Sequence, residues 1–226
     1  MTSRRELFLQ EMGLGPVWRA RGALTAAPDL GAVGAMNWTE LKAVVAGCTA
    51  CELHKTRTHT VFGIGDENAD WLFIGEAPGA EEDAQGEPFV GQAGKLLDNM
   101  LKSIGLKRGE NVYIANVVKS RPPGNRDPHR DEIAACIPYL KRQIELIQPK
   151  LIVALGKVAS ETLLGHEATI ASLRGKMHAY QDIPLIVTYH PSYLLRTLQD
   201  KARAWEDLCL AKQAMQDLCS REPATL

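Results

Sequence analysis

The chain has 226 residues, of which 45% are hydrophobic, and it carries a net charge of −1 with a pI near 6.6. This length and hydrophobic content predict a single domain around one substantial core. The near-neutral charge gives no general sign of a nucleic-acid partner, so any nucleic-acid-binding face requires a local concentration of Lys and Arg. Because there is no stretch of roughly 18 apolar residues and no signal-peptide core, we expect a cytoplasmic protein without a membrane partner.

The N-terminal 37 residues differ in composition from the rest of the chain. Residues 1–21 have the pattern of a short, imperfect amphipathic helix, and residues 22–36 are rich in small residues without periodicity, which is typical of a flexible linker. We therefore predict an appendage and linker over 1–37, a domain over 38–220 and a tail over 221–226. The partner of the appendage is unknown. The domain is expected to begin with a helix over 38–47 that Thr39 caps.

Strand-like and helical patterns alternate through the domain. Apolar runs with the length of buried strands occupy residues 71–75, 111–118, 150–155 and 184–189. Helical patterns occupy residues 92–104, 130–147, 157–165 and 201–219. This alternation predicts an α/β fold of three layers, in which a four-stranded parallel sheet lies between helices.

Polar residues follow three of the four predicted strands. They are Glu76, Asn116 with Lys119, and His190. Open parallel sheets bind their ligands beyond the carboxyl ends of the strands. The sequence therefore predicts an active site at that edge of the sheet.

The segment from residue 75 to residue 94 follows the first of these strands. Its twenty positions hold five glycines, two prolines and five acidic residues, a composition that argues against a core or a regular helix. A long polar surface loop is one interpretation, but Phe89 and Val90 are apolar residues inside it. Glycine-rich loops at strand ends commonly shape the backbone around a ligand. We predict that this segment forms one wall of the active site.

Five cysteines favour ligands or core residues over disulfides in a reducing compartment. Cys48 and Cys51 form a CxxC pair, and Cys136 lies in the helix after the RPPGNRDP loop. This spacing suits zinc, an iron–sulfur cluster or a redox pair, although cysteines also fill cores. Cys209 and Cys219, ten residues apart in the last helix, are predicted to be packing residues.

Four separated motifs carry a family resemblance between about residues 44 and 217. They are GEAPGAEEDAQGEPFVGQAGKLL, NVVKSRPPGNRDP, AACIPYLKRQIELIQPKLIVALG and HPSYLLR, in that order. The chain resembles the family 4 uracil-DNA glycosylases, the iron–sulfur enzymes of bacteria and archaea. The resemblance implies a four-stranded parallel sheet between helices. It also implies removal of uracil from DNA by hydrolysis of the N-glycosidic bond, which leaves an abasic site.

The resemblance implies two catalytic residues. Glu76 matches the acidic residue that positions or activates the attacking water, and His190 matches the histidine that stabilises the departing uracil anion. The chemistry needs these types, because bond cleavage develops a cation on the sugar and an anion on the base. Taken alone, Glu76 could equally cap a helix and His190 could be a core histidine.

The resemblance also implies a substrate pocket. Phe89 matches the aromatic residue that stacks on the flipped base, and Asn116 matches the side chain that reads the uracil edge, with Gly75 and Ala77 beside them. A base inside a duplex must be rotated out before it can be stacked and read. The amide of Asn116 offers one acceptor and two donors, a set that suits uracil and not cytosine. Singly, Phe89 could be a loop anchor and Asn116 a turn residue.

A DNA-binding face is expected around this pocket. Tyr193, Leu194 and Leu195 are candidates for the wedge that fills the space left by the flipped base, unless they only begin the next helix. Basic residues near the pocket would contact phosphates, unless the RPPGNR segment is merely a solvated loop. The residues predicted to contact DNA are Lys119, Arg121, Arg126, Ser192, Tyr193, Leu194 and Arg196.

The chain departs from the family at one cluster position. Family 4 places cysteines in a CxxC pair, in a KCRPP segment and about sixteen residues later, whereas this chain reads KSRPP. Cys48, Cys51 and Cys136 are therefore the expected ligands, with Ser120 at the position of the missing thiol. Three outcomes are open: a full 4Fe–4S cluster with an oxygen or external fourth ligand, a labile or three-iron cluster, or no cluster. We expect a cluster, because three thiolates remain at the right spacing.

We predict a monofunctional uracil-DNA glycosylase that acts as a monomer on uracil-containing DNA in the nucleoid. Glu76 favours family 4 over family 5, which has a non-acidic residue at this position. The alternative is a DNA-binding or redox-responsive module of the same fold, with turnover impaired by Ser120. A structural zinc protein needs a further ligand, and neither His54 nor His129 has a convincing spacing.

Overall fold

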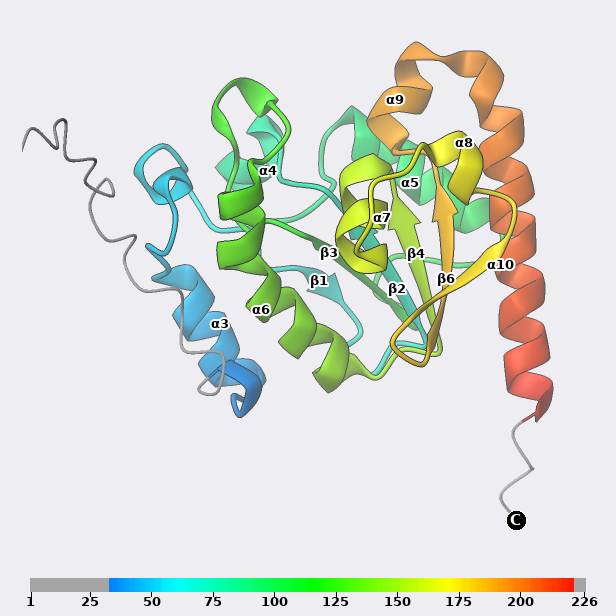
Figure 1. The fold of residues 1–226 in the computed structure, drawn as a ribbon, viewed down its shortest axis with the longest axis horizontal. Helices are drawn as coiled ribbons and strands as arrows, with labels where there is room; N and C mark the ends of the chain where they lie inside the picture. Colours follow the sequence, from blue (N-terminus) through cyan, green and yellow to red (C-terminus); the bar gives the residue numbers. More distant parts are fainter. Residues whose placement is uncertain (1–32, 222–226) are drawn as a thin grey trace, which may run out of the picture.

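The structure, a computed structural model, describes residues 33–221 (Figure 1). The predicted N-terminal helix over 1–21, most of the predicted linker and nearly all of the predicted tail lie outside these residues. Val33, at the end of the predicted linker, packs with Leu41, Val45 and Tyr139. Within residues 33–221, no helix combines the length and the apolar character needed to cross a membrane.

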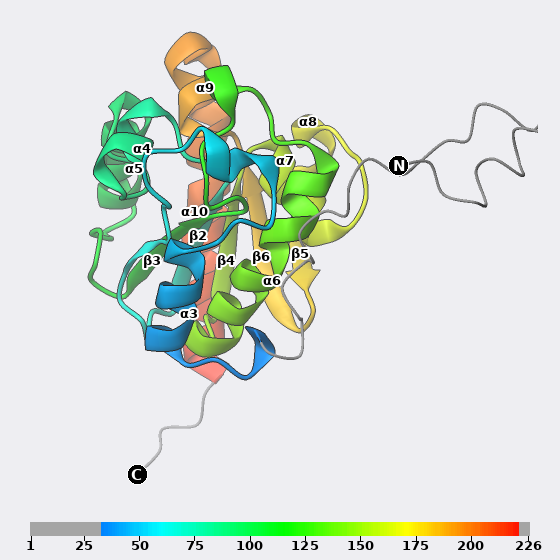
Figure 2. The ribbon, with the colours of Figure 1, turned by 90° about the vertical axis from the view of Figure 1, so that its left-hand side faces the viewer.

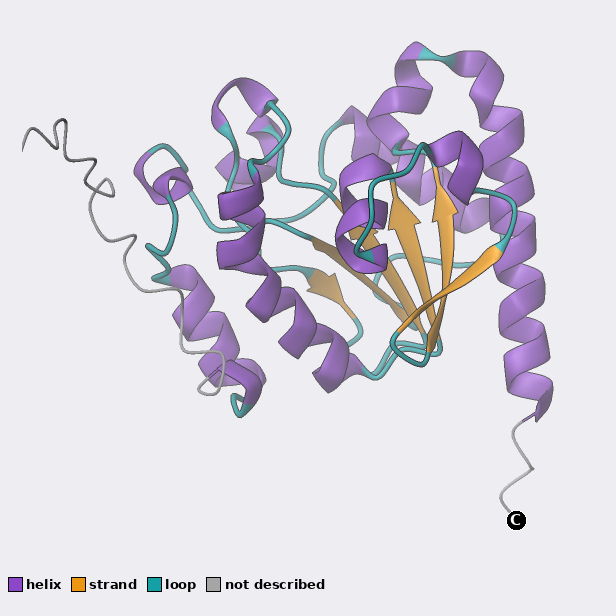
Figure 3. Ribbon diagram, viewed as in Figure 1, coloured by secondary structure: helices purple, strands orange, loops and turns teal. Residues whose placement is uncertain are grey.

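A six-stranded mixed sheet forms the centre of the domain, with the strand order β1-β3-β2-β4-β6-β5. The strands are β1 (Ile64–Gly65), β2 (Trp71–Gly75), β3 (Val112–Asn116), β4 (Leu151–Leu155), β5 (Met177–Tyr180) and β6 (Ile183–Thr188). The central strands β3, β2, β4 and β6 are parallel, as predicted, and their carboxyl ends point the same way (Figure 3). The edge strands β1 and β5 are antiparallel to their neighbours.

The prediction of four strands was wrong in number because the edge strands lack an apolar run. β1 has only two residues, and Met177 of β5 is 52% exposed. By contrast, every residue of β2, β3 and β4 is buried, which is typical of a parallel sheet covered on both faces. Edge strands that are short or exposed leave little signal in a sequence.

Helices cover both faces of the sheet, which confirms the three-layer architecture. They are α3 (Trp38–Ala46), α4 (Ala80–Gln85), α5 (Gln92–Ser103), α6 (Arg130–Ile147), α7 (Lys157–Leu164), α8 (Ile170–Leu173), α9 (Pro191–Arg196) and α10 (Lys201–Arg221). Apolar residues of α6 and α7 pack on one face, and those of α5 and α10 pack on the other. Figure 1 shows α6 and α10 on opposite sides of the sheet, and Figure 2 shows α3 outside α6.

Two local predictions were wrong because side-chain caps decide where helices begin. The cap of α3 is Asn37 and not Thr39, since Asn37 Oδ1 accepts the N–H of Glu40 at 3.1 Å and Glu40 Oε2 accepts the N–H of Asn37 at 2.9 Å. The glycine-rich segment contains the short helix α4, which begins where Glu82 reaches back to the N–H of Gly79. A good cap therefore allows a helix between glycines.

The last helix buries small and aliphatic residues and exposes both of its cysteines. Ala204, Leu208 and Ala211 face the sheet, whereas Cys209 and Cys219 are exposed. The prediction that these cysteines are packing residues was therefore wrong. Their register places them off the apolar stripe that the helix buries.

Candidate active site

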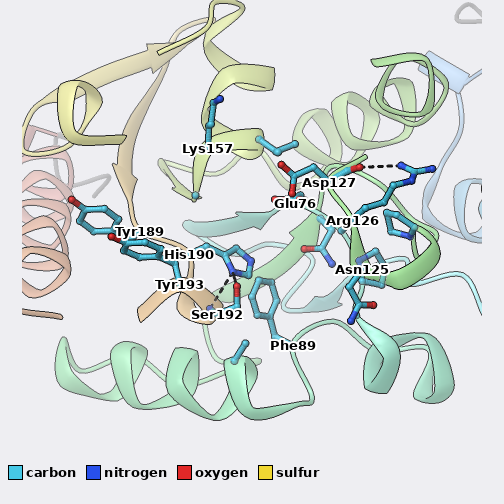
Figure 4. Close-up of a pocket in the computed structure, with 18 of the residues that line it drawn as sticks. Glu76, Phe89, Asn125, Arg126, Asp127, Lys157, Tyr189, His190, Ser192 and Tyr193 are labelled. Atoms are coloured by element: carbon cyan, nitrogen blue, oxygen red, sulfur yellow. Dashed lines mark hydrogen bonds between the residues drawn. The ribbon is translucent and has the colours of Figure 1, made fainter. Parts of the chain in front are cut away.

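A cavity of about 770 Å³ lies at the carboxyl ends of the parallel strands. Each of these strands contributes a lining residue at or just after its end: Glu76 from β2, Asn116 from β3, Gly156 from β4 and His190 from β6. Phe89 enters from the segment between α4 and α5 (Figure 4). The structure thus brings together the four side chains that sequence reasoning placed at the site.

Phe89 and Asn116 both approach Gly75, and we call the part of the cavity that these three residues form the base slot. A Cβ atom built on Gly75 would lie 2.5 Å from Asn116 Oδ1 and 2.6 Å from Cζ of Phe89. Only glycine at this position lets the ring and the amide approach each other. Phe89 is 6% exposed, and its ring centroid lies 5.6 Å from that of His190.

Asn116 Oδ1 has an unusual environment. The residue is 2% exposed, yet this oxygen has no hydrogen-bond donor among residues 33–221. A buried polar atom without a partner costs about 1–3 kcal/mol, so proteins seldom leave one unless something else satisfies it. Asn116 also lines the cavity, so this unpaired oxygen belongs to a residue of the cavity wall.

The segment that carries Phe89 is held by one carboxylate. Glu82 accepts hydrogen bonds from the backbone N–H groups of Gly79, Val90 and Gly91, at 3.1, 3.0 and 3.1 Å. It therefore ties the beginning of α4 to the backbone just after Phe89. Sequence reasoning missed Glu82, although the spacing of an acidic residue three positions after a helix start is a recognisable capping signal.

His190 caps α9 and is held in one tautomer. Its Nδ1 accepts the N–H of Ser192 at 3.2 Å and lies 2.8 Å from Ser192 Oγ (Figure 4). The ring proton therefore resides on Nε2, because Nδ1 acts as an acceptor. Burial lowers the pKa of His190 to about 4. At neutral pH the side chain is an uncharged imidazole with one N–H donor.

Glu76 lies against a second carboxyl group, that of Asp127 (Figure 4). Burial, the negative charge of Asp127 and a hydrogen bond to Asp127 together raise the pKa of Glu76 to about 7. Near neutral pH the carboxyl group of Glu76 can therefore either hold or release a proton. Sequence reasoning missed Asp127, because it belongs to the loop after β3 and not to a strand end.

Two of the residues predicted to contact DNA are buried. Lys119 is 2% exposed, and its Nζ donates to the carbonyl of Asn116 at 2.7 Å and to Gln143 Oε1 at 2.6 Å. It fixes the end of β3 and cannot reach a phosphate, so that prediction was wrong. Leu194, only 1% exposed, packs in the core and cannot be a wedge, whereas its neighbour Leu195 is 42% exposed.

The other predicted DNA contacts lie at the rim of the cavity or beside it. Arg196 is exposed and lines the cavity, together with Ser192, Tyr193 and Arg126. Arg126 is paired with the buried Glu132 at 2.7 Å. Arg121 is not among the lining residues, and its Nε donates to Asn125 at 2.7 Å.

Tyr193 is a wall residue and not a free wedge. Its ring stacks on Tyr189, with the ring centroids 5.2 Å apart, and its hydroxyl donates to Asp200 at 2.6 Å. Tyr189 and Lys157 also line the cavity, and sequence reasoning missed both of them. Aromatic residues next to a strand end resemble ordinary core residues, so no sequence signal separates them.

The three cysteines of the predicted cluster also lie near one another, around Tyr139. The thiols of Cys51 and Cys136 are hydrogen bonded, which lowers the pKa of Cys51 to about 7 and raises that of Cys136. Cys48 Sγ accepts the hydroxyl of Tyr139 at 3.3 Å. We call the segments that carry these thiols and Ser120 the cysteine lobe.

Ser120 joins the cysteine lobe through its neighbour in sequence. The N–H of Lys119 contacts Cys136 Sγ at 3.5 Å, and Ser120 Oγ accepts from Arg57 Nη1 at 3.0 Å. Within residues 33–221, no three His, Cys, Asp or Glu side chains are close enough to hold a single metal ion. Three thiols and a buried hydroxyl do suit a multi-iron cluster, whose ligands are cysteines spread around several atoms.

Comparisons with known proteins agree with this geometry. A sequence model described as the Uracil DNA glycosylase superfamily matches residues 62–209. The chain belongs to this superfamily. It is 43% identical over 190 residues to a type-4 uracil-DNA glycosylase of Archaeoglobus fulgidus, covering 80% of this chain and 93% of the relative.

Two further type-4 uracil-DNA glycosylases are similarly close. The protein of Sulfurisphaera tokodaii is 47% identical over 69% of this chain and 74% of its own length. That of Thermotoga maritima is 46% identical over 74% of this chain and 89% of its own length. Within the superfamily, the chain is therefore a member of the type-4 group.

Proposed function

We propose that this glycosylase superfamily member removes uracil from DNA by hydrolysing the bond between the base and its deoxyribose. The observation that carries this function is the buried Asn116 Oδ1, which lacks a donor among residues 33–221 while it borders the base slot. Uracil presents the N3–H donor that this oxygen needs, next to an O4 acceptor for the amide N–H of Asn116. Cytosine presents the opposite pattern on the same edge, so the slot rejects it.

His190 and Glu76 divide the chemistry between the base and the sugar. The bond between C1′ and N1 breaks, and its electron pair passes into the uracil ring towards O2. The Nε2–H of neutral His190 donates a hydrogen bond to O2 and so stabilises the negative charge that develops there. The oxygen of a water molecule forms the new bond to C1′, and its proton passes to the carboxylate of Glu76.

DNA reaches the slot across a rim of mixed character. The exposed Arg196 supplies positive charge for a phosphate, and the exposed Leu195 is placed on the same short helix to fill the space left by the flipped base. Of the three wedge candidates Tyr193, Leu194 and Leu195, this proposal retains Leu195. We propose uracil-containing DNA in the nucleoid as the partner of a monomeric enzyme.

For the cysteine lobe we propose a 4Fe–4S cluster. Cys48, Cys51 and Cys136 would hold it, with Ser120 Oγ or an external ligand at the fourth position. The cluster would fix the loop after β3 relative to α3 and α6, and it takes no part in breaking the glycosidic bond. Iron content and the visible absorption spectrum of the full chain test this assignment, since an iron-free, colourless preparation would contradict it.

Uracil release from a labelled oligonucleotide tests the function itself. The wild-type chain should release free uracil and leave an abasic site in an oligonucleotide with one uracil, and it should leave the matched cytosine and thymine oligonucleotides intact. Tight binding of the uracil oligonucleotide without release would instead favour the alternative of a binding module. Substituting Glu76 or His190 by alanine should abolish measurable turnover while binding persists.

A further inference from the structure

Phe89 has a backbone conformation that an aromatic residue rarely adopts. Its φ is +55°, in the left-handed region, which is strained for a bulky side chain. The following turn is equally tight, because a Cβ atom on Gly94 would lie 1.7 Å from the carbonyl oxygen of Phe89. Such a conformation persists only where neighbouring contacts impose it.

Arg108 makes those contacts from outside the cavity. It lies in the connection between α5 and β3, and it is not among the residues that line the site. Its Nη1 donates to the carbonyl of Pro88 at 2.9 Å, and its Nη2 donates to the carbonyl of Phe89 at 2.8 Å. The rigid guanidinium thus holds two successive carbonyl groups at a fixed spacing.

The guanidinium is itself held in place. Its Nε donates to Asp98 Oδ1 of α5 at 2.9 Å, and the side chain is only 23% exposed. On the other side of the turn, Glu82 holds the N–H groups of Val90 and Gly91. The peptide units on both sides of Phe89 are therefore fixed by two charged side chains: Glu82, which lines the cavity, and Arg108, which does not.

We propose that Arg108 is a positioning residue that sets the aromatic wall of the base slot. It holds Phe89 in its left-handed conformation, so that the ring stands opposite Asn116 before any base arrives. This inference rests on the proposed function, because it assigns Phe89 to the stacking of the flipped uracil. Arg108 touches neither the base nor the reacting atoms and acts only through Phe89.

The substitution Arg108→Met removes the guanidinium group, with its hydrogen bonds to Pro88 and Phe89, and keeps much of the apolar part of the side chain. Stacking acts on the base in both the bound and the transition state, so its loss raises KM and leaves kcat nearly unchanged. We expect KM for a uracil oligonucleotide and the inhibition constant of free uracil to rise together by about 10-fold, with kcat within about 3-fold. Arg108→Lys keeps the positive charge but not the paired N–H donors of the guanidinium group, so its KM should lie between those of the wild type and Arg108→Met.

A double-mutant cycle with Phe89→Ala distinguishes this role from general stabilisation. In the Phe89→Ala background, Arg108→Met should have no further effect on KM or on uracil inhibition. Two controls accompany it: Arg130→Met, which removes a 90% exposed arginine paired with Glu167, and Met215→Ala, which destabilises the core far along α10. Neither control should change uracil inhibition.

Two outcomes would overturn the proposal. One is that Arg108→Met raises KM by the same factor in the wild-type chain and in the Phe89→Ala variant. The other is an equal rise in KM in Met215→Ala, if that variant loses as much Tm as Arg108→Met does. Binding of free uracil, measured by calorimetry, reports on the slot independently of catalysis. If the wild-type chain binds free uracil but does not excise it from DNA, the proposed function is refuted. The effect of Arg108 on uracil binding can still be measured in that case.

Discussion

The base slot and the cysteine lobe are built by different means. The slot takes Gly75 and Asn116 from the ends of β2 and β3, where the two residues are paired in the sheet. The cysteine lobe collects its groups from the turn after α3, the loop after β3 and helix α6. In the lobe, Cys51 contacts Cys136 and Cys48 contacts Tyr139, whereas in the slot Asn116 Oδ1 has no donor among residues 33–221. The slot is thus organised before its ligand binds, whereas the proposed cluster would help to order the lobe.

The largest expected effect is at the open acceptor of the slot. Asn116→Leu keeps the approximate volume of the side chain but removes the groups that read N3–H and O4. We expect kcat/KM for uracil excision to fall by about 10³–10⁴-fold, since a site built to hydrogen-bond its substrate loses most when the pairing is lost. Single-turnover kinetics measure this. The control Asn99→Leu, on the exposed face of α5, should leave the rate unchanged.

A steric change to the slot is expected to rank second. Gly75→Ala would place a methyl group 2.5 Å from Asn116 Oδ1 and 2.6 Å from the Phe89 ring. Because the slot is too narrow to relax fully, we expect excision to slow by about 10²-fold, through a geometric misplacement of the base. Gly47→Ala, where the new atom meets only the carbonyl of Ala43 at 3.9 Å, is the matched control. Equal rates for both variants would mean that the slot is not where the base binds.

The carboxyl pair predicts a pH dependence. Glu76 must be ionised to accept a proton from water, and its pKa is raised to about 7, so kcat/KM should increase with pH through that value. Asp127→Asn removes the neighbouring negative charge, which lowers the pKa of Glu76 and moves the acidic limb to lower pH. Asp131→Asn, an exposed position on α6, is the control. If the acidic limb of the pH profile stays at the same pH in Asp127→Asn, then Asp127 does not set the pKa of the catalytic group.

The smallest effect on catalysis is expected in the cysteine lobe. Ser120→Cys restores a thiol at the fourth position, which should raise the iron content per chain and increase Tm by a few degrees through tighter binding of the cluster. Excision should change by less than about 3-fold, since no lobe residue lines the slot. Ser220→Cys serves as the thiol control on exposed α10. A change of tenfold or more in kcat for Ser120→Cys would show that the two regions are coupled.

Sequence reasoning located the parallel strands and the four residues at the cavity because buried strands and the motifs after them leave strong local signals. It misplaced Lys119 and Leu194, because nothing in a linear pattern distinguishes a lysine that bonds Gln143 in the core from one that faces solvent. Asp127 and Arg108 were missed for a related reason. Each acts on a residue far away in the chain, Glu76 and Phe89, so only the folded arrangement reveals the contact.

The two antiparallel edge strands have a consequence for how the enzyme loses activity. Because β1 and β5 cover the sheet edges, each of the four parallel strands has a neighbour on both sides, and none can separate without opening the whole sheet. The segments 76–94 and 117–129 contain no strand of the sheet, so they make few of its main-chain hydrogen bonds and can open locally. In rising denaturant, hydrogen exchange should therefore begin in these segments while the strands stay protected. Uracil excision should accordingly fail before the sheet unfolds.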